Sequence, residues 1–306
     1  MNPSLDLFGS TQTLYDDSKS RCDESAREPG GGGINVARNL LRMGDTALAI
    51  FPAGGVNGDL LRQLMKENRA AFRSPDIAAE TRQSVIITEK SSKKMYHLVF
   101  PGPDLQESEW QECLAVVKTI EPAPEFLVLS GSMPDGVPSD FFGQLAAHAA
   151  SKRIKVVLDT SEPSLRPCLE AGVYLAKLNR AEFAELGFST DGDHQSLMDG
   201  MQSLVGEGAA EILIVTLGSR GAALISKDGE KLHFTPPPTE IVSHVGAGDA
   251  FVSALVHQLH GGNSVREAFR YGVAAAATAI QTPGNQLYDL DLLEEVYKNT
   301  VNGFKY

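Results

Sequence analysis

Short apolar runs alternate with amphipathic stretches along most of this chain. The runs have the length and the Val, Ile and Leu content of buried strands, and they lie at 47–51, 125–129, 154–158, 212–217 and 222–226. The amphipathic stretches carry apolar residues at helical spacing and predict helices at 58–68, 107–120, 139–152, 181–186, 195–205, 247–260, 264–281 and 291–299. This alternation predicts an α/β fold with a Rossmann-like, mostly parallel sheet and helices on both of its faces.

A second pattern, typical of a β-hairpin, covers residues 84–100. The stretches 84–88 and 95–100 favour strands, and the polar residues 90–93 between them favour a turn. Residues 8–28 are polar and lean toward strand as well. Because no change in composition marks a linker, we expect residues 1–306 to form a single domain.

The composition limits the partners and the compartment. Of the 306 residues, 42% are hydrophobic and 22% are charged, and the formal net charge of −12 disfavours nucleic acid and anionic membranes as partners. Cys22, Cys113 and Cys168 are far apart and lack metal-ligand spacing, which predicts free thiols in a reducing compartment. No apolar stretch approaches the roughly 20 residues of a membrane span, and the first residues lack a signal-peptide pattern, so we expect a cytoplasmic protein.

The most informative motif runs from Gly246 through Ala247 and Gly248 to Asp249, directly before an apolar helical run. Such a loop exposes the unpaired N–H groups of the first helical turn to an anion, and the helix dipole adds to the attraction. A carboxylate beside a bound phosphate suits a base that takes the proton of an attacking hydroxyl. The alternative is a tight turn in which Asp249 only caps the helix.

A second glycine run, Gly30 to Gly33, precedes Asn35 and another amphipathic stretch. Consecutive glycines cost conformational entropy, which indicates that a ligand or another segment approaches the backbone closely. Together the two motifs resemble the signatures of the PfkB-type (ribokinase-like) carbohydrate kinases. Across the chain, the most similar branch is that of the minor, isozyme II-type 6-phosphofructokinases.

The resemblance implies an ATP- and Mg²⁺-dependent kinase of a ketohexose phosphate, most simply of fructose 6-phosphate, giving the glycolytic 1,6-bisphosphate. Asp249 would be the base, and the Gly246, Ala247 and Gly248 amides would stabilise the transferring phosphoryl group. Tagatose 6-phosphate and fructose 1-phosphate are the alternative substrates. The alternative that is not an enzyme is a catalytically inactive relative that binds a sugar phosphate. The hypothesis of a dinucleotide-dependent oxidoreductase is rejected, because the dinucleotide-binding motif needs an apolar strand before its glycines and the segment before Gly30 is polar.

Further site residues follow from the same resemblance. The sugar would contact Ser4, Asp6, Gly31, Gly32, Gly33 and Asn35, and its phosphate would contact Lys19, Arg82 and Ser132. ATP would contact Lys177, Asn179, Thr216, Gly218, Gly221, Ser243, Val245, Gly246 and Gly248. The alternative for Lys19 and Arg82, each taken singly, is that they are solvated surface cations. The alternative for the Thr216–Gly221 loop is an ordinary β-turn.

The metal is expected to be held through water by Glu182 and Asp159. Asn179 and Glu182 are three residues apart at a helix start, and Asp159 follows an apolar strand. A capping Asn with a first-turn Glu is the alternative for that spacing. The resemblance also allows a monovalent cation such as K⁺. His244 occupies a place that the family usually gives to Thr or Ser, which puts the neighbouring contact in doubt.

The resemblance makes two structural expectations. Residues 8–28 and 82–101 would form a small β-sheet lid over the sugar, and the apolar outer face of the lid would pair with that of a second subunit in a homodimer. In the family a hydrophobic core strand runs into a segment like Asn2–Asp6, and this sequence shows no such strand before that segment. We expect either that the true start lies upstream or that this protein lacks the strand.

Overall fold

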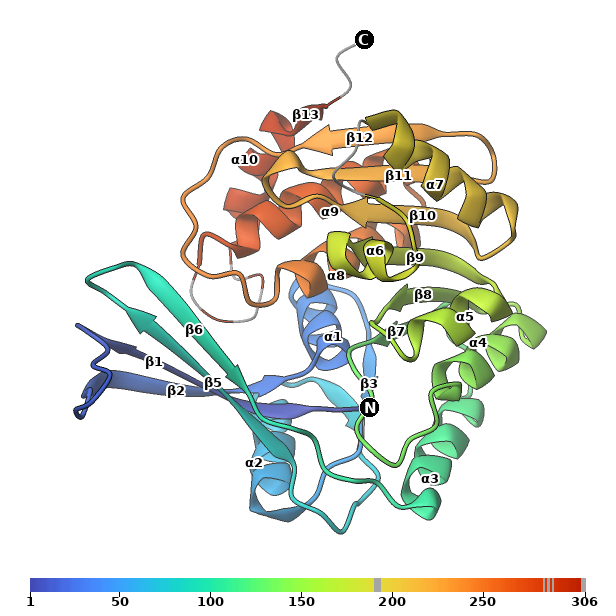
Figure 1. Cartoon of the computed structure of the whole chain (residues 1–306). Helices are drawn as coiled ribbons and strands as arrows, with labels where there is room; N and C mark the ends of the chain where they lie inside the picture. The colour runs from blue at the N-terminus through green and yellow to red at the C-terminus, as the bar shows by residue number, and fades with distance from the viewer. Residues whose placement is uncertain (190–193, 283, 285–286, 288, 304–306) are drawn as a thin grey trace.

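Apolar strands lie side by side in the central sheet of the computed structural model, which describes residues 1–189, 194–282, 284, 287 and 289–303 (Figure 1). The sheet has the order β13-β12-β11-β10-β9-β8-β7. Its strands are β7 (Phe126–Ser130), β8 (Lys155–Asp159), β9 (Val173–Asn179), β10 (Ala210–Thr216), β11 (Ala222–Ser226), β12 (Lys231–Thr235) and β13 (Val301–Asn302).

The sheet is mixed, which corrects the expectation of a mostly parallel one. Strands β7 to β10 are parallel, because a crossover with a helix connects each to the next. Strands β11, β12 and β13 pair antiparallel. The turn from β11 to β12 is tight, with the Ser226 N–H donating to the Glu230 carbonyl at 3.0 Å, and such a turn reverses the chain direction.

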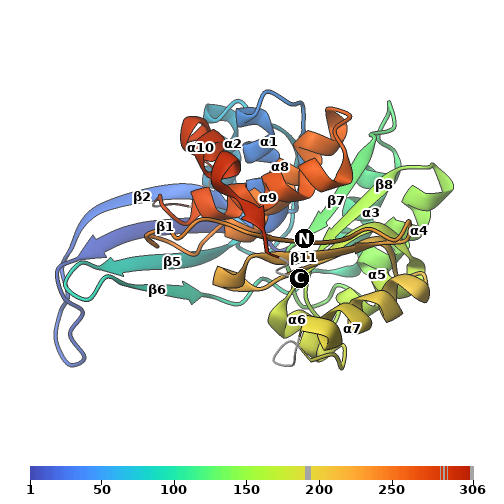
Figure 2. The ribbon, with the colours of Figure 1, turned by 90° about the horizontal axis from the view of Figure 1, so that it is seen from above.

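Helices cover both faces of the sheet, as the apolar pattern predicts (Figure 2). On β8, the side chains of Val156 and Leu158 pack into one core and the side chain of Val157 packs into another, because successive side chains of a strand point to opposite faces. One layer contains α3 (Glu107–Lys118), α4 (Phe141–Ser151), α5 (Leu165–Ala171), α6 (Arg180–Glu185) and α7 (His194–Gly206). The other contains α1 (Gly32–Arg42), α8 (Ala247–His260), α9 (Val265–Ala279) and α10 (Leu290–Asn299).

A separate small sheet extends away from this body (Figures 1 and 2). It has the order β2-β1-β5-β6, formed by β1 (Ser4–Thr11), β2 (Cys22–Gly30), β5 (Arg82–Glu89) and β6 (Lys94–Val99). The predicted hairpin is therefore present as β5 and β6. The small sheet begins earlier than expected, since β1 starts at Ser4.

The remaining strands, β3 (Leu48–Ile50) and β4 (Ala71–Arg73), pair only with each other, and α2 (Gly55–Glu67) lies between them in the sequence. Within the described residues β7 is an end strand of the central sheet and pairs only with β8. No described helix is both long enough and apolar enough to cross a membrane. Cys22, Cys113 and Cys168 are free thiols, as expected.

Candidate active site

Polar side chains meet at the carboxyl ends of the parallel strands, where open α/β sheets bind ligands. Ser130, at the end of β7, pairs in register with Asp159 at the end of β8. Asn179, at the end of β9, pairs with Thr216 at the end of β10. The register therefore aligns one polar residue from each of four strands along a single edge.

The Gly246–Asp249 motif forms the first turn of α8 at this edge. Gly246 is the N-cap and adopts a left-handed conformation with φ 78°. The Ala250 N–H donates to the Gly246 carbonyl at 2.8 Å, which starts the helical ladder. The N–H groups of Ala247, Gly248 and Asp249 precede that bond and are therefore oriented toward an incoming ligand, with the positive end of the helix dipole behind them.

The second glycine run brings the start of α1 against the same site. Gly31, with φ 111°, is the N-cap of α1. A Cβ atom on Gly32 would overlap the Ser130 hydroxyl oxygen and lie 3.1 Å from Asp249 Oδ1, so a side chain has no room there. Asn35 Nδ2 donates to Asp249 Oδ2 at 2.8 Å. The two motifs, some 200 residues apart in the sequence, thus form one site.

The Asp249 carboxyl titrates far above its ordinary range. Burial is the largest cause, and together with the nearby Asp159 carboxylate it raises the pKa of Asp249 to about 7. Asp6 acts in the same direction, while the hydrogen bond from Asn35 and the charge of Lys177 act in the opposite one. A carboxylate with a pKa near neutrality is suited to general-base catalysis.

Lys177 lies beneath the start of α8 and is buried. Its Nζ atom donates to Asp159 Oδ1 at 2.5 Å. Burial acts to lower the pKa of Lys177, but the charges of Asp159, Glu182 and Asp249 outweigh it and raise that pKa. A Cβ atom on Gly248 would lie 3.3 Å from Lys177 Nζ, so the glycine lets the helix start approach the ion pair closely.

The carboxylates of Asp159, Glu182 and Asp249 match the oxygen donors that Mg²⁺ prefers. Burial raises the pKa of Glu182, and the charge of Asp159 raises it further, so negative charge at this edge exceeds what Lys177 balances. A divalent cation would relieve that excess. Among the described residues, no cluster of three potential metal-ligating His, Cys, Asp or Glu side chains occurs.

Asn179 and Glu182 also form the capping box at the start of α6. Glu182 N–H donates to Asn179 Oδ1 at 3.0 Å, and Asn179 N–H donates to Glu182 Oε2 at 2.7 Å. The capping alternative is therefore realised. It fixes both side chains beside Asp159 and does not conflict with a role in binding a hydrated ion.

The remaining predicted nucleotide residues lie in two loops. Thr216 Oγ1 donates to the Leu178 carbonyl at 3.3 Å, which ties β10 to β9. Gly218 and Gly221 both have positive φ values, 65° and 83°, and a Cβ atom on Gly221 would overlap the Phe234 carbonyl oxygen. These glycines are required by the turn itself.

The loop before α8 contains the other two predicted nucleotide residues. Ser243 is buried, and its hydroxyl oxygen accepts from the Val245 N–H at 3.1 Å. His244 between them is exposed to solvent.

Asp6 connects the site to the small sheet. It is 4% exposed, and its Oδ1 accepts a hydrogen bond from Ser4 Oγ at 2.6 Å. A Cβ atom on Gly30 would overlap the Asp6 carboxylate, so the glycine run is needed for this approach. The charge of Asp6 acts on both Asp249 and Arg82, which places it electrostatically between them.

Arg82 and Ser132 meet through the backbone and side chain of Asn2. Arg82 Nη2 donates to the Asn2 carbonyl at 3.0 Å, and Nη1 donates to the Phe100 carbonyl at 3.2 Å. Asn2 Nδ2 in turn donates to Ser132 Oγ at 3.2 Å. Burial lowers the pKa of Arg82, and Asp6 opposes that shift. The carbonyl oxygens of Asn2 and Phe100 thus fix the orientation of the Arg82 guanidinium group.

Lys19 does not join this group within the chain. It is exposed in the loop between β1 and β2, beyond the pair Thr11 and Cys22, whereas Arg82 pairs with Ser4 at the opposite end of β1. Seven residue steps at about 3.3 Å each separate these ends by more than about 20 Å.

Sequence reasoning missed Asn2 and Ser130. The Asn2 carbonyl and amide link Arg82 to Ser132, and the Ser130 hydroxyl packs against Gly32. Ser130 could have been found, because it directly follows an apolar run whose end must lie beside Asp159. Asn2 belongs to the segment Asn2–Asp6 that resembles the family, but nothing in the sequence indicated its hydrogen bonds to Arg82 and Ser132.

Comparison with known proteins agrees with this geometry. The family described as pfkB family carbohydrate kinase matches residues 2–291. ATP-dependent 6-phosphofructokinase isozyme 2 of Mycobacterium tuberculosis is 36% identical over 298 residues, which cover 97% of this chain and 87% of the relative. The isozyme 2 enzyme of Escherichia coli is 35% identical over 297 residues, covering 96% and 95%. D-tagatose-1-phosphate kinase of Bacillus licheniformis is 30% identical over 297 residues, with the same coverage.

Comparison with solved structures also finds phosphofructokinases. Phosphofructokinase-2 from Escherichia coli in complex with substrates and products superposes with a TM-score of 0.92, and the complex with potassium with 0.91. Each is 34% identical and covers 97% of this chain and 96% of its own. The chain therefore belongs to the pfkB family of carbohydrate kinases, which transfer a phosphoryl group from ATP to an alcohol.

Proposed function

We propose that this kinase phosphorylates the C1 hydroxyl of fructose 6-phosphate and so produces fructose 1,6-bisphosphate. The observation that carries the proposal is a buried carboxyl group and a cation that both lie within electrostatic reach of one acidic residue. Asp249 lies at the start of α8, Arg82 lies at the root of the small sheet, and Asp6 acts electrostatically on both. That arrangement suits a sugar with a free hydroxyl at one end and a phosphate at the other.

The names of the relatives support the same substrate class without selecting one sugar. Two of them are 6-phosphofructokinases and one is a D-tagatose-1-phosphate kinase. Fructose 6-phosphate is favoured because the Arg82 guanidinium group and the Ser132 hydroxyl group, which Asn2 links, suit contacts to a phosphate on the sugar. Tagatose 6-phosphate and fructose 1-phosphate are the alternative substrates.

In the proposed reaction, Asp249 accepts the C1 hydroxyl proton as the sugar oxygen attacks the γ-phosphorus of ATP. Asn35 keeps the Asp249 carboxylate oriented through its 2.8 Å hydrogen bond. The N–H groups at the start of α8 donate to the phosphoryl oxygens, and Lys177 holds positive charge beneath them. Asp6 and the backbone of the glycine run position the sugar.

Asp159 and Glu182 would hold the Mg²⁺ ion of Mg·ATP through water. When bound, this ion neutralises charge on the transferring phosphoryl group. Lys177 donates a hydrogen bond to the Asp159 carboxylate, and Asn179 fixes Glu182 through the capping box. We also propose a monovalent cation such as K⁺, because the potassium complex is among the structures that this chain resembles.

Asp249→Asn should leave binding of both substrates largely intact and lower kcat by roughly 10²- to 10⁴-fold, since the amide cannot accept the proton. Initial rates in a coupled ADP-release assay measure kcat, and thermal shifts with each substrate report binding. Asp140→Asn, at the exposed start of α4, is the matched control and should retain full activity. More than a tenth of the wild-type rate in Asp249→Asn would remove Asp249 from the role of base.

The activity should fall as the pH is lowered through about 7, because protonation of Asp249 removes the base. A plot of log kcat/KM against pH should therefore show an acid limb near that value. Asn35→Ala removes a hydrogen bond that lowers the pKa of Asp249, so the limb should move to higher pH. A limb at the same pH in both proteins would assign it to another group.

Arg82→Ala should lower kcat/KM for fructose 6-phosphate by roughly 10- to 200-fold. A charge-assisted contact to phosphate contributes about 1.5–3 kcal/mol, and about 1.4 kcal/mol is one decade. The already poor use of free fructose should barely change, so the measured quantity is the ratio of the two kcat/KM values. Lys94→Ala, on exposed β6, is the control. An equal loss with both sugars would make Arg82 a structural residue.

The small sheet should act as a lid that pairs with a second subunit. Tyr96, Leu98 and Phe100 occupy alternate positions on and after β6, with Leu98 55% and Phe100 51% exposed. A contiguous apolar face of this kind marks an interface. Because Lys19 lies at the far tip of its own lid, any contact with the sugar phosphate would be made in the other subunit.

Light scattering at micromolar concentration should therefore give about twice the chain mass of 32.8 kDa. Leu98→Lys should shift the mass toward the monomer without changing the far-UV circular dichroism, because a charge cannot be buried there unpaired. Val301→Lys, at an exposed site on β13, should remain dimeric. A wild-type mass near that of one chain would contradict the lid interface.

A further inference from the structure

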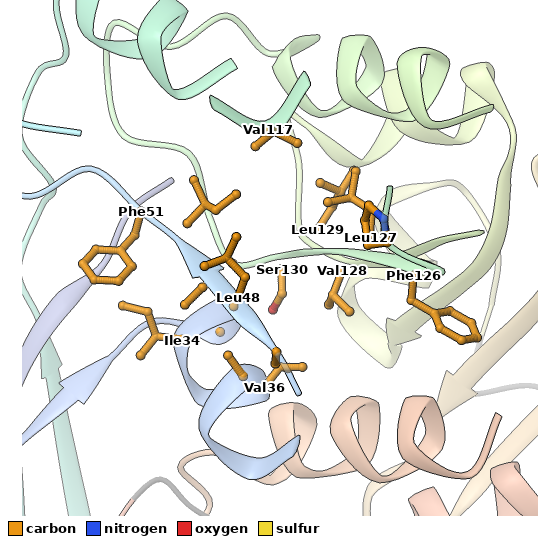
Figure 3. Close-up of a pocket in the computed structure, with 18 of the residues that line it drawn as sticks. Ile34, Val36, Leu48, Phe51, Val117, Phe126, Leu127, Val128, Leu129 and Ser130 are labelled. Atoms are coloured by element: carbon orange, nitrogen blue, oxygen red, sulfur yellow. The ribbon is translucent and has the colours of Figure 1, made fainter. Parts of the chain in front are cut away.

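Ser130 is a polar residue on a face of β7 that is otherwise apolar. Phe126 and Val128 pack against the core beneath α1 and α8, whereas Leu129 packs into the core of the opposite layer. Because successive side chains of a strand alternate between its faces, Ser130 points toward α1 and α8, as Val128 does. Among the residues labelled in Figure 3, which line a cavity beside β7, Ser130 is the only polar one.

The backbone that follows Ser130 is fixed on both sides. The Gly131 N–H donates to the Asp159 carbonyl at 3.1 Å, and Thr160 Oγ1 donates to the Gly131 carbonyl at 2.7 Å. Gly131 has φ 92°, and a Cβ atom on it would lie 3.6 Å from the Gly32 backbone nitrogen. The end of β7 is therefore attached to the end of β8 and lies directly against the start of α1.

The Ser130 hydroxyl oxygen lies close to the carboxyl group of Asp249. A Cβ atom on Gly32 would overlap Ser130 Oγ and would lie 3.1 Å from Asp249 Oδ1, so both oxygens are near the same point. Their separation is thus within the roughly 5.5 Å that one hydroxyl group spans when it is hydrogen-bonded to two oxygens. No direct hydrogen bond joins the two side chains within the described ranges. The space between them suits one bridging hydroxyl group.

Both oxygens have hydrogen-bonding capacity for such a group. Asp249 Oδ2 accepts from Asn35 Nδ2 at 2.8 Å, which leaves Oδ1 to accept from a ligand. Ser130 is 8% exposed, and its hydroxyl group has no hydrogen-bond partner in the part of the chain that the structure describes. Buried hydroxyl groups are normally paired, and a serine hydroxyl can donate one hydrogen bond. A ligand hydroxyl that donates to Asp249 Oδ1 and accepts from Ser130 would satisfy both side chains.

We propose that Ser130 is a further catalytic residue, whose hydroxyl group donates a hydrogen bond to the same sugar hydroxyl that Asp249 deprotonates. The inference rests on the proposed function. The C1 hydroxyl then gives its proton to Asp249 Oδ1 and uses one oxygen lone pair to accept from Ser130. Its other lone pair forms the new bond to the γ-phosphorus, while the bond from that phosphorus to the ADP oxygen breaks.

The contribution of Ser130 is orientation rather than proton transfer. A single contact with Asp249 would leave the sugar hydroxyl free to rotate about its hydrogen bond, so that its lone pairs would point in several directions. A second contact from Ser130 selects one direction, and holding the reacting atoms in line accelerates the reaction. Ser130 is not among the groups that shift the pKa of Asp249, so it leaves the base itself unchanged.

Another interpretation is that Ser130 is present only because it is small. The approach of Gly32 leaves little room for a larger side chain at the end of β7. Alanine would fit that space equally well but has no hydroxyl group. Ser130→Ala therefore separates the two interpretations, and it removes a single oxygen atom without creating an overlap.

The test compares wild type and Ser130→Ala with fructose 6-phosphate and with 1-deoxyfructose 6-phosphate, which lacks the C1 hydroxyl. Calorimetry without ATP gives the Kd of each sugar. Ser130→Ala should weaken the binding of fructose 6-phosphate by roughly 3- to 10-fold, as expected for one neutral hydrogen bond. It should leave the Kd of the 1-deoxy sugar unchanged and should lower kcat/KM for fructose 6-phosphate by at least the same factor. An equal change for both sugars, or none, would overturn the proposal.

The control is Ser139→Ala, at an exposed serine just before α4, which should behave as wild type with both sugars. In Ser130→Ala the acid limb of log kcat/KM should stay at the wild-type pH, because the variant changes a contact to the sugar and not to the base. A displaced limb would show that Ser130 acts on Asp249 instead and would contradict the proposal.

Failure of the wild-type chain to use fructose 6-phosphate would count against the proposed function alone. The sugar phosphate that the chain does phosphorylate, paired with its analogue lacking the accepting hydroxyl, then provides the same comparison for Ser130. The expected result is again a loss of affinity in Ser130→Ala for the complete sugar only. Equal losses with that sugar and its analogue would refute the role of Ser130.

Discussion

The buried ion pair between Asp159 and Lys177 sets the charge balance of the whole site. It sits where β8 and β9 end, and the start of α8 lies directly above it. The charges of Asp159, Glu182 and Asp249 all act on this single ammonium, and burial together with repulsion by Asp159 raises the pKa values of Asp249 and Glu182. Removing Lys177 would leave these charges buried without compensation, which is strongly destabilising. Lys177 therefore influences both the pKa of Asp249 and the stability of the fold.

Three glycines allow the elements that carry these charged groups to approach one another closely. Gly248 allows α8 to approach Lys177, Gly32 allows α1 to approach Ser130 and Asp249, and Gly30 allows β2 to pack on Asp6. A side chain at Gly30 or Gly32 would collide with the side chain of Asp6 or Ser130, and one at Gly248 would press on Lys177. The site is therefore a junction of two helix starts, one sheet edge and the root of the small sheet, and Asp249 and Arg82 both lie within electrostatic reach of Asp6.

Much of this arrangement could be predicted from the sequence because local patterns determine it. The run Ala222–Ser226 and the helix Ala247–His260 have the predicted bounds, and the two glycine motifs meet as expected. Strand β9 was missed because Lys177 interrupts its apolar run, and only the tertiary pairing with Asp159 shows why a buried strand carries a lysine there. The mixed character of the sheet was also missed, since apolar runs do not encode strand direction.

Other features depend on long-range placement. The remoteness of Lys19 from Arg82 follows from the register of β1 with β2 and β5, which no local pattern fixes. The role of Asn2 follows from hydrogen bonds to residues 80 and 130 positions away.

The most direct test of the account is the rate of ADP formation from Mg·ATP with fructose 6-phosphate, with fructose and with no sugar. The account predicts rapid turnover with fructose 6-phosphate, a kcat/KM at least roughly tenfold lower with fructose, as expected for the loss of one charge-assisted phosphate contact, and only background hydrolysis without sugar. Equal kcat/KM values for fructose and fructose 6-phosphate would contradict a site built around a base at Asp249 and a phosphate-binding cation at Arg82.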